Sequence, residues 1–231
     1  MSRVLAFDFG ASTGRAILAE YNGEKIEYNE IHRFDNVLCE QNGMLCWDFD
    51  YLLGEVKKAI SLAENADSLA FDTWGVDYGM LDKDGNLVSK PVCYRDDRTK
   101  GMTDKIYQSV SPSKLYAKTG NQIMPINTLF QLTADGTDNA EMFLFMPDLF
   151  AYSLCGAKSV DKTIASTSQM LDLENVEWQK DIFALSGKNE KILPPIVNCA
   201  TVVGEYNGIK VIKVAGHDTC LLYTSDAADE L

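Results

Sequence analysis

The sequence predicts a single α/β domain in which a mixed β-sheet is flanked by helices. Apolar runs typical of strands fill the first 34 residues, an amphipathic helical pattern follows at 49–63, and further strand patterns come after it. The chain of 231 residues is 46% hydrophobic, which is enough for a substantial core. We find no internal repeat and no low-complexity linker that would divide it.

Three consecutive antiparallel strands are expected at the N-terminus. An apolar run at 4–9 is separated by the glycine turn 10–14 from a second apolar run at 16–19. A turn at 21–24 then leads to a strand at 25–34, and Asn42-Gly43 forms another turn before a short extended piece at 44–47.

The first clear helix begins after Asp48, a residue type favoured at the N-cap, and its apolar positions recur at helical spacing to residue 63. A short strand at 68–71 follows. If residues 72–80 continue as one strand, Trp74 shares a face with Val76, whereas Gly75 shares the other face with Asp77. The segment 82–86 has the composition of a hairpin turn.

Helices dominate the next part of the chain. Ser111-Pro112 predicts a helix that ends at Gly120, Asn127 is placed to cap another, and a third runs from Met146 to about Gly156. Residues 157–200 have the weakest pattern, with a Ser/Thr-rich loop at 163–168 and a helix near 177–185. A final strand is expected at 209–214.

Composition excludes several classes of protein. The net charge of −13 argues against a nucleic-acid surface, and no apolar run approaches the ~20 residues of a membrane span. The N-terminus lacks a signal-peptide pattern, so we expect a cytoplasmic protein without membrane contact. Six cysteines without a C-x-x-C pair and only two histidines argue against zinc and do not require disulfides.

The last residues differ in character from the rest. Residues 220–230 read CLLYTSDAADE, which resembles the in-frame translation of a transposase-end adapter used in DNA library preparation. We therefore expect a natural domain at 1–219 and a non-native tail at 220–231.

The glycine turn is the first candidate site. A Gly-Ala-Ser-Thr-Gly turn can point several N–H groups at one spot and so bind an anion. Gly10 and Gly14 permit unusual backbone conformations, and Asp8 is placed to hold a cation, or water on a cation, beside the anion. The alternative interpretation is an ordinary hairpin with a solvated aspartate.

Four short clusters of polar residues lie at strand ends, where an α/β sheet gathers its ligand contacts: 8–15, 72–78, 94–98 and 216–219. Each alone has a structural interpretation. Asp72 could satisfy backbone groups, Trp74 could belong to the core, Tyr94-Arg95 could end a surface strand, and His217-Asp218 could form a turn.

Together these clusters resemble the N-terminal half of the FGGY family of carbohydrate kinases. The likeness covers residues 3–219 and rests on seven segments: 7–15, 30–34, 41–43, 72–78, 91–96, 127–132 and 216–219. The first and last segments are similar to many sugar kinases. The Asp-Thr-Trp-Gly-Val-Asp and Tyr-Arg-Asp segments resemble the rhamnulokinase branch of the family.

The resemblance implies a ribonuclease-H-like domain of the actin/hexokinase type. In the family a second, C-terminal domain, which this chain lacks, holds the adenosine of ATP, and the sugar lies between the two. By the same resemblance, Asp218 is the catalytic base and Asp8 a water-mediated partner of Mg²⁺. The turn contacts the ATP phosphates through Ala11, Ser12, Thr13, Gly14 and Arg15, and the sugar is contacted by Gly75, Asp77, Tyr94, Arg95, His217, Asp218 and Thr219.

The implied reaction is phosphorylation of L-rhamnulose at its 1-hydroxyl. A carboxylate that accepts the hydroxyl proton contributes typically ~10²–10⁴-fold in rate, and Gly75 would let the sugar rest against main chain. Trp74 is expected to wall the pocket from behind. Without a second domain the chain should bind sugar weakly, should not turn over, and should expose apolar surface where that domain would dock.

Three alternatives stay open. One is a kinase for another ketose, such as xylulose or fuculose. Another is a non-catalytic, nucleotide-responsive module with an actin-like fold. The last is a sugar-binding module in its own right. The oligomeric state cannot be read from the sequence.

Overall fold

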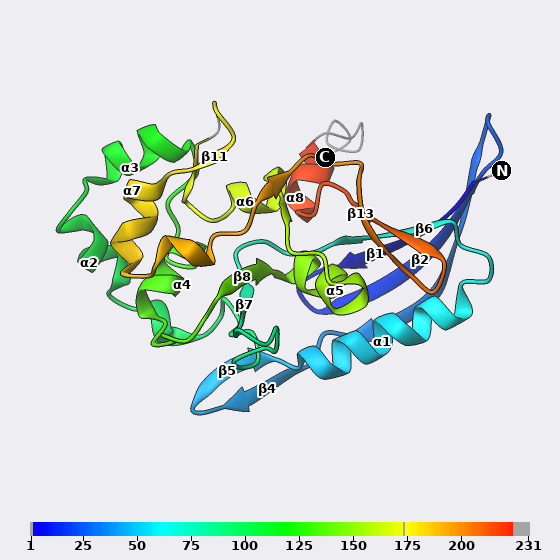
Figure 1. Cartoon of the computed structure of the whole chain (residues 1–231), viewed down its shortest axis with the longest axis horizontal. Helices are drawn as coiled ribbons and strands as arrows, with labels where there is room; N and C mark the ends of the chain where they lie inside the picture. The colour runs from blue at the N-terminus through cyan, green and yellow to red at the C-terminus, as the bar shows by residue number, and fades with distance from the viewer. Residues whose placement is uncertain (1, 173, 224–231) are drawn as a thin grey trace.

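The computed structural model describes residues 2–172 and 174–223 (Figure 1). Eight α-helices are found in these residues: α1 Phe49–Leu62, α2 Met102–Tyr107, α3 Pro112–Thr119, α4 Thr128–Ala134, α5 Met146–Cys155, α6 Lys162–Ser166, α7 Lys180–Phe183 and α8 Asp218–Tyr223. Three short 3-10 turns accompany them: η1 Asp97–Thr99, η2 Ala184–Ser186 and η3 Glu190–Ile192.

The strands of the same residues form one large sheet and several small pairs. The large sheet contains β1 Ser2–Phe9, β2 Thr13–Tyr21, β3 Ile26–Asp35, β6 Ser68–Asp72, β13 Thr201–Tyr206 and β14 Ile209–Lys213. The pairs are β4 Leu38–Gln41 with β5 Met44–Trp47, β7 Tyr78–Leu81 with β8 Met142–Phe145, β9 Val160–Asp161 with β12 Ile196–Val197, and β10 Leu171–Asp172 with β11 Glu177–Trp178.

The large sheet is mixed, with the order β13-β14-β6-β1-β2-β3. Strands β1, β2 and β3 form an antiparallel meander, whereas β6 runs parallel to both β1 and β14. The register places Asp8 opposite Asp72 on one side and opposite Arg15 on the other. Polar residues from three strands therefore meet at one end of the sheet.

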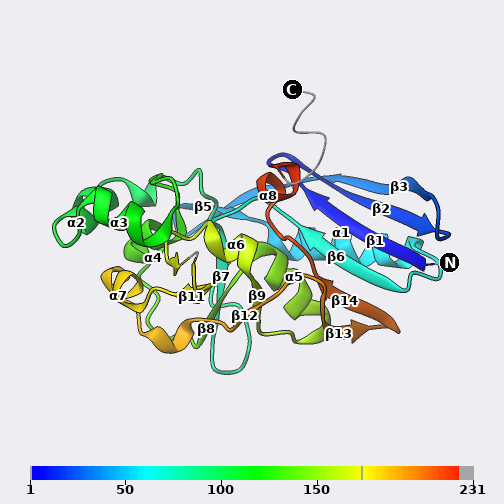
Figure 2. The ribbon, with the colours of Figure 1, turned by 90° about the horizontal axis from the view of Figure 1, so that it is seen from above.

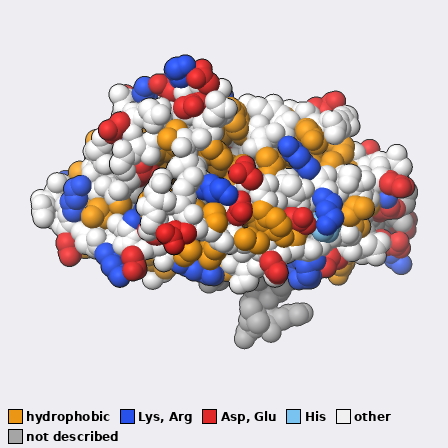
Figure 3. Space-filling model, turned by 90° about the horizontal axis from the view of Figure 1, so that it is seen from below, with side chains coloured by type: hydrophobic (Ala, Val, Ile, Leu, Met, Phe, Trp, Pro, Cys, Tyr) orange, Lys and Arg blue, Asp and Glu red, His pale blue; other side chains and the backbone are white. Residues whose placement is uncertain are grey.

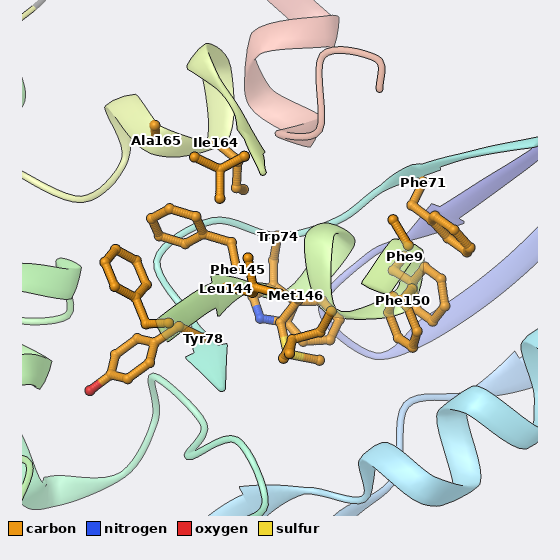
Figure 4. Close-up of a cluster of buried hydrophobic side chains, with 14 of the residues drawn as sticks. Phe9, Phe71, Trp74, Tyr78, Leu144, Phe145, Met146, Phe150, Ile164 and Ala165 are labelled. Carbon is orange, nitrogen blue, oxygen red and sulfur yellow. The ribbon is translucent and has the colours of Figure 1, made fainter. Parts of the chain in front are cut away.

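One face of this sheet carries the core. Leu5, Phe7 and Phe9 of β1 are at most 1% exposed, as the period of two predicts for a strand with one buried face. Phe150 of α5 stacks on Phe9 at 4.7 Å between ring centroids and also on Phe71 of β6, and these rings lie together in Figure 4. The buried aromatic rings thus fix α5 against the ends of β1 and β6 that carry the polar residues.

Helix α1 lies along the sheet, whereas most of the other helices form a second region beside it (Figures 1 and 2). Figures 1 and 2 show α2, α3, α4 and α7 grouped at the end of the molecule away from the N-terminus, with α6 and α8 at the junction with the sheet. Basic and acidic side chains are interspersed with hydrophobic ones over the face drawn in Figure 3. Within the described residues, no helix has the length and apolar character needed to cross a membrane.

Several predicted elements are confirmed. The three N-terminal strands and the turns between them are present. Helix α3 begins after Ser111, whose side chain accepts the amide of Lys114, and both α3 and α5 end at glycines in the left-handed conformation, with φ of 59° at Gly120 and 75° at Gly156. Local capping chemistry therefore determined these helix ends.

Other predictions were wrong. Residues 72–80 do not form one strand, because β6 ends at Asp72 and β7 begins at Tyr78. The expected loop at 163–168 is largely the short helix α6, and β8 and β13 lie where no strand was predicted. Asp48 occupies the N-cap of α1, but its carboxylate bonds Lys90 instead of the helix amides. Most of the predicted tail, at 224–231, lies outside the described residues.

Candidate active site

A cavity of about 500 Å³ opens at the junction of the sheet with the small helices. Its walls come from five separate stretches of the chain, which contribute Trp74, Gly75 and Val76; Tyr94; Asn121, Gln122, Met124, Ile126 and Asn127; Ser166 and Thr167; and His217, Asp218, Thr219 and Cys220. The structure therefore brings three of the four predicted clusters together in one cavity. The glycine turn contacts this region through Arg95, as described below.

Asp218 is placed by the backbone that follows β14. Thr73 donates its amide to the carbonyl of Gly216 and accepts the amide of Asp218, so this segment extends the parallel pairing beyond β6. The carboxylate of Asp161, 1% exposed, accepts the amide of Gly216 at 3.2 Å. These contacts leave Asp218 as the first residue of α8, with a side chain that is 41% exposed and lines the cavity.

His217 supports the same segment. Its Nε2 lies 3.4 Å from Oδ1 of Asp218, and its Nδ1 lies 3.3 Å from Sγ of Cys220. Burial lowers the pKa of His217 below its ordinary value of 6.5, so the ring is neutral at pH 7. Cys220 was predicted to belong to a non-native tail, and in this structure it forms part of the cavity wall.

The segment 74–77 is a strained bend. Val76 has a φ of 68°, a conformation that a β-branched residue adopts only when its surroundings impose it. Its amide donates to Oγ1 of Thr167 at 3.0 Å, and its carbonyl accepts Oγ1 of Thr128 at 2.8 Å and Nε2 of Gln131 at 3.3 Å. Three buried side chains thus hold the bend that carries Gly75 into the cavity.

Neighbouring side chains leave little space for a Cβ at position 75, so glycine is favoured there. A Cβ on it would lie 2.9 Å from Cγ2 of Thr167 and 3.2 Å from Cδ2 of His217. Its φ is not in the left-handed region. Gly75 therefore packs closely against two residues of the cavity wall, and its contact with a sugar stays a prediction.

Asp77 occupies a different place from the one expected. It is 1% exposed and is not among the residues that line the cavity. Its Oδ2 accepts Nε1 of Trp47 at 2.7 Å, Nε1 of Trp74 at 3.0 Å and the amide of Tyr94 at 3.1 Å. Asp77 therefore fixes the back of the cavity wall. Burial raises its pKa to about 6 even though these donors favour the ionised form.

The prediction that Trp74 and Asp77 lie on opposite faces of one strand is also wrong. A regular strand would place these side chains on opposite faces, but the bend at Val76 lets the Trp74 indole N–H reach the carboxylate. Trp74 remains 5% exposed and lines the cavity, so its predicted role as a wall agrees with its position.

The glycine turn is anchored by a residue that the sequence pattern did not single out. Asn36 donates its side-chain amide to the carbonyl of Gly10 at 2.6 Å and its backbone amide to the carbonyl of Ser12 at 2.8 Å. The amides of Ala11 and Ser12 donate no hydrogen bond among the described residues, and both residues are exposed. The turn therefore presents free N–H groups to solvent, as an anion site requires.

Gly14 has a packing role. A Cβ there would collide with the ring of Phe34, a buried residue of β3, and the φ of Gly14 is not in the left-handed region. The expectation that Gly10 and Gly14 serve unusual backbone conformations was therefore wrong. Gly14 permits the Phe34 ring to cover the end of β1 and β2.

Asp8 and Arg15 are bound to each other. Nε and Nη2 of Arg15 each lie 2.7 Å from Oδ2 of Asp8 across the β1–β2 pair. Asp72 lies on the other side of Asp8, and its buried Oδ1 has no hydrogen-bond partner among the described residues. Burial first, and then the charges of Asp8, Asp218 and Asp161, raise the pKa of Asp72 to about 8.

Some residues of the cavity were missed by sequence reasoning. Asn121 donates to the carbonyl of Ser166 at 2.9 Å and so joins two walls, and Thr167 packs against Gly75. Both lie in loops or short helices without a periodic pattern, and only their juxtaposition in space reveals them. The Ser/Thr-rich composition at 163–168 was the one available signal.

The chain belongs to the FGGY family of carbohydrate kinases: the model of the family's N-terminal domain matches residues 3–221. The family resemblance stated from the sequence is therefore confirmed. The rhamnulokinase branch is a finer assignment, which this match does not address.

Solved structures agree in fold. A ligand-bound xylulose kinase from Lactobacillus acidophilus superimposes with a TM-score of 0.79 at 15% identity, covering 94% of this chain and 48% of that one. A gluconate kinase from the same organism gives the same values. A Plasmodium falciparum glycerol kinase with ADP gives a TM-score of 0.75 at 14% identity, covering 93% and 48%.

These matches confirm the mixed α/β, actin-like fold predicted from the sequence. The chain spans about half the length of the solved kinases that it matches.

Proposed function

We propose that this chain is the sugar-binding half of an ATP-dependent ketose kinase, and that its substrate is L-rhamnulose, phosphorylated at the 1-hydroxyl. One observation supports this proposal most: Asp218 lines a cavity of about 500 Å³ that lies close to the glycine turn. Arg95, the neighbour of the lining residue Tyr94, donates a hydrogen bond to the carbonyl of Ala11 in that turn. A proton acceptor, a sugar-sized cavity and an anion site are thus adjacent, as phosphoryl transfer to an alcohol requires.

The chain's own residues have distinct tasks in this proposal. The turn amides of Ala11 and Ser12, with Thr13 and Gly14, bind phosphate oxygens of ATP. Asp218 accepts the proton of the attacking hydroxyl as the new O–P bond forms and the bond to the ADP oxygen breaks. His217 and Thr219 flank that carboxylate, because the amide of Thr219 donates to Oδ1 at 2.7 Å. Gly75 and Tyr94 complete the sugar's surroundings.

Magnesium is expected with ATP, and the carboxylates fit it. Asp8 and Asp72 present hard oxygen donors at adjacent strand ends, and one buried oxygen of Asp72 has no hydrogen-bond partner in the part of the chain that the structure describes. No group of three His, Cys, Asp or Glu side chains able to hold a metal is found in residues 2–172 and 174–223. This donor set suits an ion held mainly by phosphate and water, since Mg²⁺ bound with ATP takes few protein ligands.

The choice of L-rhamnulose rests on the sequence segments at 72–77 and 94–96, which resemble rhamnulokinases. The alternative is another ketose, because several structural neighbours carry the name xylulose kinase. We further propose that a second, C-terminal domain binds the adenosine. In the absence of that domain we expect the chain to bind sugar weakly and not to turn over.

A panel of ketoses tests the proposal with the full-length protein. ATP-dependent phosphorylation of L-rhamnulose, L-fuculose, D-xylulose and glycerol is measured by coupled ADP release, and the product is located by phosphorus NMR. The highest kcat/KM with L-rhamnulose supports the proposal. A strong preference for D-xylulose contradicts the choice of sugar but retains the reaction class.

The non-catalytic alternatives have their own test. Calorimetry with residues 1–219 measures sugar binding without a second domain. Micromolar L-rhamnulose binding together with no turnover by the full-length protein would favour a sugar-binding module. Nucleotide binding without sugar binding would favour an actin-like module instead.

A further inference from the structure

Arg95 differs from every other arginine of the chain. The sequence has five arginines, and four of them lie within 4 Å of a carboxylate: Arg3 with Glu20, Arg15 with Asp8, Arg33 with Glu30 and Arg98 with Asp135. Among the described residues, no carboxylate lies within that distance of Arg95, whose side chain is exposed. Its positive charge is therefore available to an anion.

The contacts of Arg95 place this charge between two sites. Nε donates to the hydroxyl of Tyr94 at 3.3 Å, and the guanidinium lies 5.3 Å from the centre of that ring. Nη2 donates to the carbonyl of Ala11 at 3.4 Å. Tyr94 lines the cavity with Asp218, whereas Ala11 belongs to the glycine turn. Long contacts to neutral groups such as these orient a guanidinium without neutralising it.

The surroundings explain why a free cation is needed there. Arg15 also lies at the turn, but its charge is offset because two of its guanidinium nitrogens contact Oδ2 of Asp8. Asp8 lies opposite Asp72 where β1 and β6 end, and Thr73, the residue after Asp72, accepts the amide of Asp218. A phosphoryl group that moves past the carboxylates of Asp8 and Asp218 meets repulsion, which a guanidinium fork counters through two N–H···O bonds.

We propose that Arg95 binds the phosphoryl group in transit from ATP to the sugar, rather than the sugar itself. The inference rests on the proposed kinase function and deepens it. The bond from the γ-phosphorus to the ADP oxygen breaks, the bond to the sugar oxygen forms, and the hydroxyl proton passes to Asp218. Arg95 exchanges no proton and stabilises the charge spread over the phosphoryl oxygens.

The variant Arg95→Met of the full-length kinase distinguishes binding of the phosphoryl group from binding of the sugar. Loss of a donor that acts in the transition state lowers kcat by about 100- to 1,000-fold and leaves the KM of the sugar unchanged. Guanidinium chloride added to this variant should restore part of the rate, and Arg95→Lys should retain part of it. The matched control is Arg3→Met, because Arg3 pairs with Glu20 at the end of β1 remote from Asp8 and should keep wild-type rates.

Two further measurements test the role of Arg95 separately from the choice of sugar substrate. Sugar binding by Arg95→Met, measured by calorimetry, should equal that of wild type. A raised KM or lost sugar binding with kcat retained would overturn the inference. If the wild-type protein phosphorylates no sugar tested, the proposed function fails, and ATP hydrolysis with water as acceptor then reports on Arg95 alone. A lower hydrolysis rate in Arg95→Met supports the inference, and an equal rate contradicts it.

Discussion

Asp8 and Asp72 lie directly opposite each other where the parallel strands β1 and β6 end. Arg15 binds Asp8, whereas the buried Oδ1 of Asp72 has no hydrogen-bond partner within residues 2–172 and 174–223. The two carboxylates are therefore unequal: the pKa of Asp72 is raised to about 8, chiefly by burial and next by the charge of Asp8. Asp72 is neutral in the folded protein at pH 7, so it can donate a hydrogen bond until a cation restores its ionised form.

Replacing Asp72 with Asn should change how stability depends on pH. Between its ordinary pKa of 3.8 and about 8, the unfolded chain has lost the Asp72 proton while the folded chain retains it. Stability therefore falls as pH rises through this window, by up to about 1.4 kcal/mol per pH unit from this residue. Asp72→Asn removes that slope, so it should gain stability relative to wild type as pH rises toward 8.

Urea titrations of the two proteins at pH 5 and pH 8 measure this effect. Comparing variants cancels the contributions of other groups that titrate in the window, such as Asp77 and His217. Asp84→Asn is the control, since Asp84 is 63% exposed in a surface turn. Parallel pH profiles for wild type and Asp72→Asn would contradict the raised pKa.

Asp218→Asn tests the general base. The amide cannot accept the hydroxyl proton, so kcat of the full-length protein should fall by about 10²- to 10⁴-fold. Sugar binding should persist, because the asparagine oxygen can still accept the amide of Thr219. Steady-state kinetics and calorimetry give the two readings. Asp97→Asn, which changes an exposed residue of η1, should behave as wild type. Turnover retained in Asp218→Asn would rule out this residue as the base.

Gly75→Ala tests the packing of the cavity wall. The new methyl group would press on Thr167 and His217, and overpacking of this kind costs about 1–3 kcal/mol. We expect a lower melting temperature and weaker sugar binding. Adding Thr167→Ser removes the Cγ2 that the methyl meets but keeps the hydroxyl that accepts the amide of Val76, so the double variant should recover part of both losses.

Gly54→Ala is the matched control for this substitution. Gly54 lies in α1 with nothing within 4 Å of its added Cβ, so alanine there should stabilise the helix by about 0.5–1 kcal/mol. If Gly75→Ala were equally stabilising, the close approach of Thr167 to Gly75 would be wrong.

Asp77→Asn tests the support behind the cavity. Three donors converge on Oδ2 and Gln131 donates to Oδ1 at 2.9 Å. An amide group in place of either oxygen leaves buried donors without an acceptor, at a cost of about 1–3 kcal/mol. Because Trp74 and Tyr94 are among these donors and also line the cavity, sugar affinity should fall as well.

Leu132→Ala distinguishes this effect from general destabilisation. Leu132 is buried in α4 and does not line the cavity, so its truncation should lower stability by about 2–5 kcal/mol yet leave sugar affinity intact under folding conditions. Equal affinity in Asp77→Asn and wild type would show that Asp77 supports the fold alone.

The sequence predicted the parts of the fold that depend on neighbours along the chain. The hairpin turns, the N-cap of α3 at Ser111 and its C-cap at Gly120 follow from local backbone and capping chemistry. Strands β8 and β13 were missed because their stability comes from partners far along the chain, namely β7 and β14. Strand pairing of this kind leaves a weak local signal.

The candidate site was predicted as a set of residues rather than as an arrangement. The segments around Gly75, Tyr94 and Asp218 were expected to meet, and they share one cavity. The role first given to Asp77 changed because the bend at Val76 turns that carboxylate inward. Such a bend is imposed by Thr167 and Thr128, which lie remote in sequence.

The sequence by itself therefore determined the family, the order of strands in the N-terminal meander and the residue types available for the proposed phosphoryl transfer. Only the tertiary structure decided that Gly14 makes room for Phe34, that burial raises the pKa of Asp72, and that Arg95 has no carboxylate partner among the described residues. The physical reason is that packing, burial and charge interactions depend on distances in space. Those distances join residues that no local pattern connects.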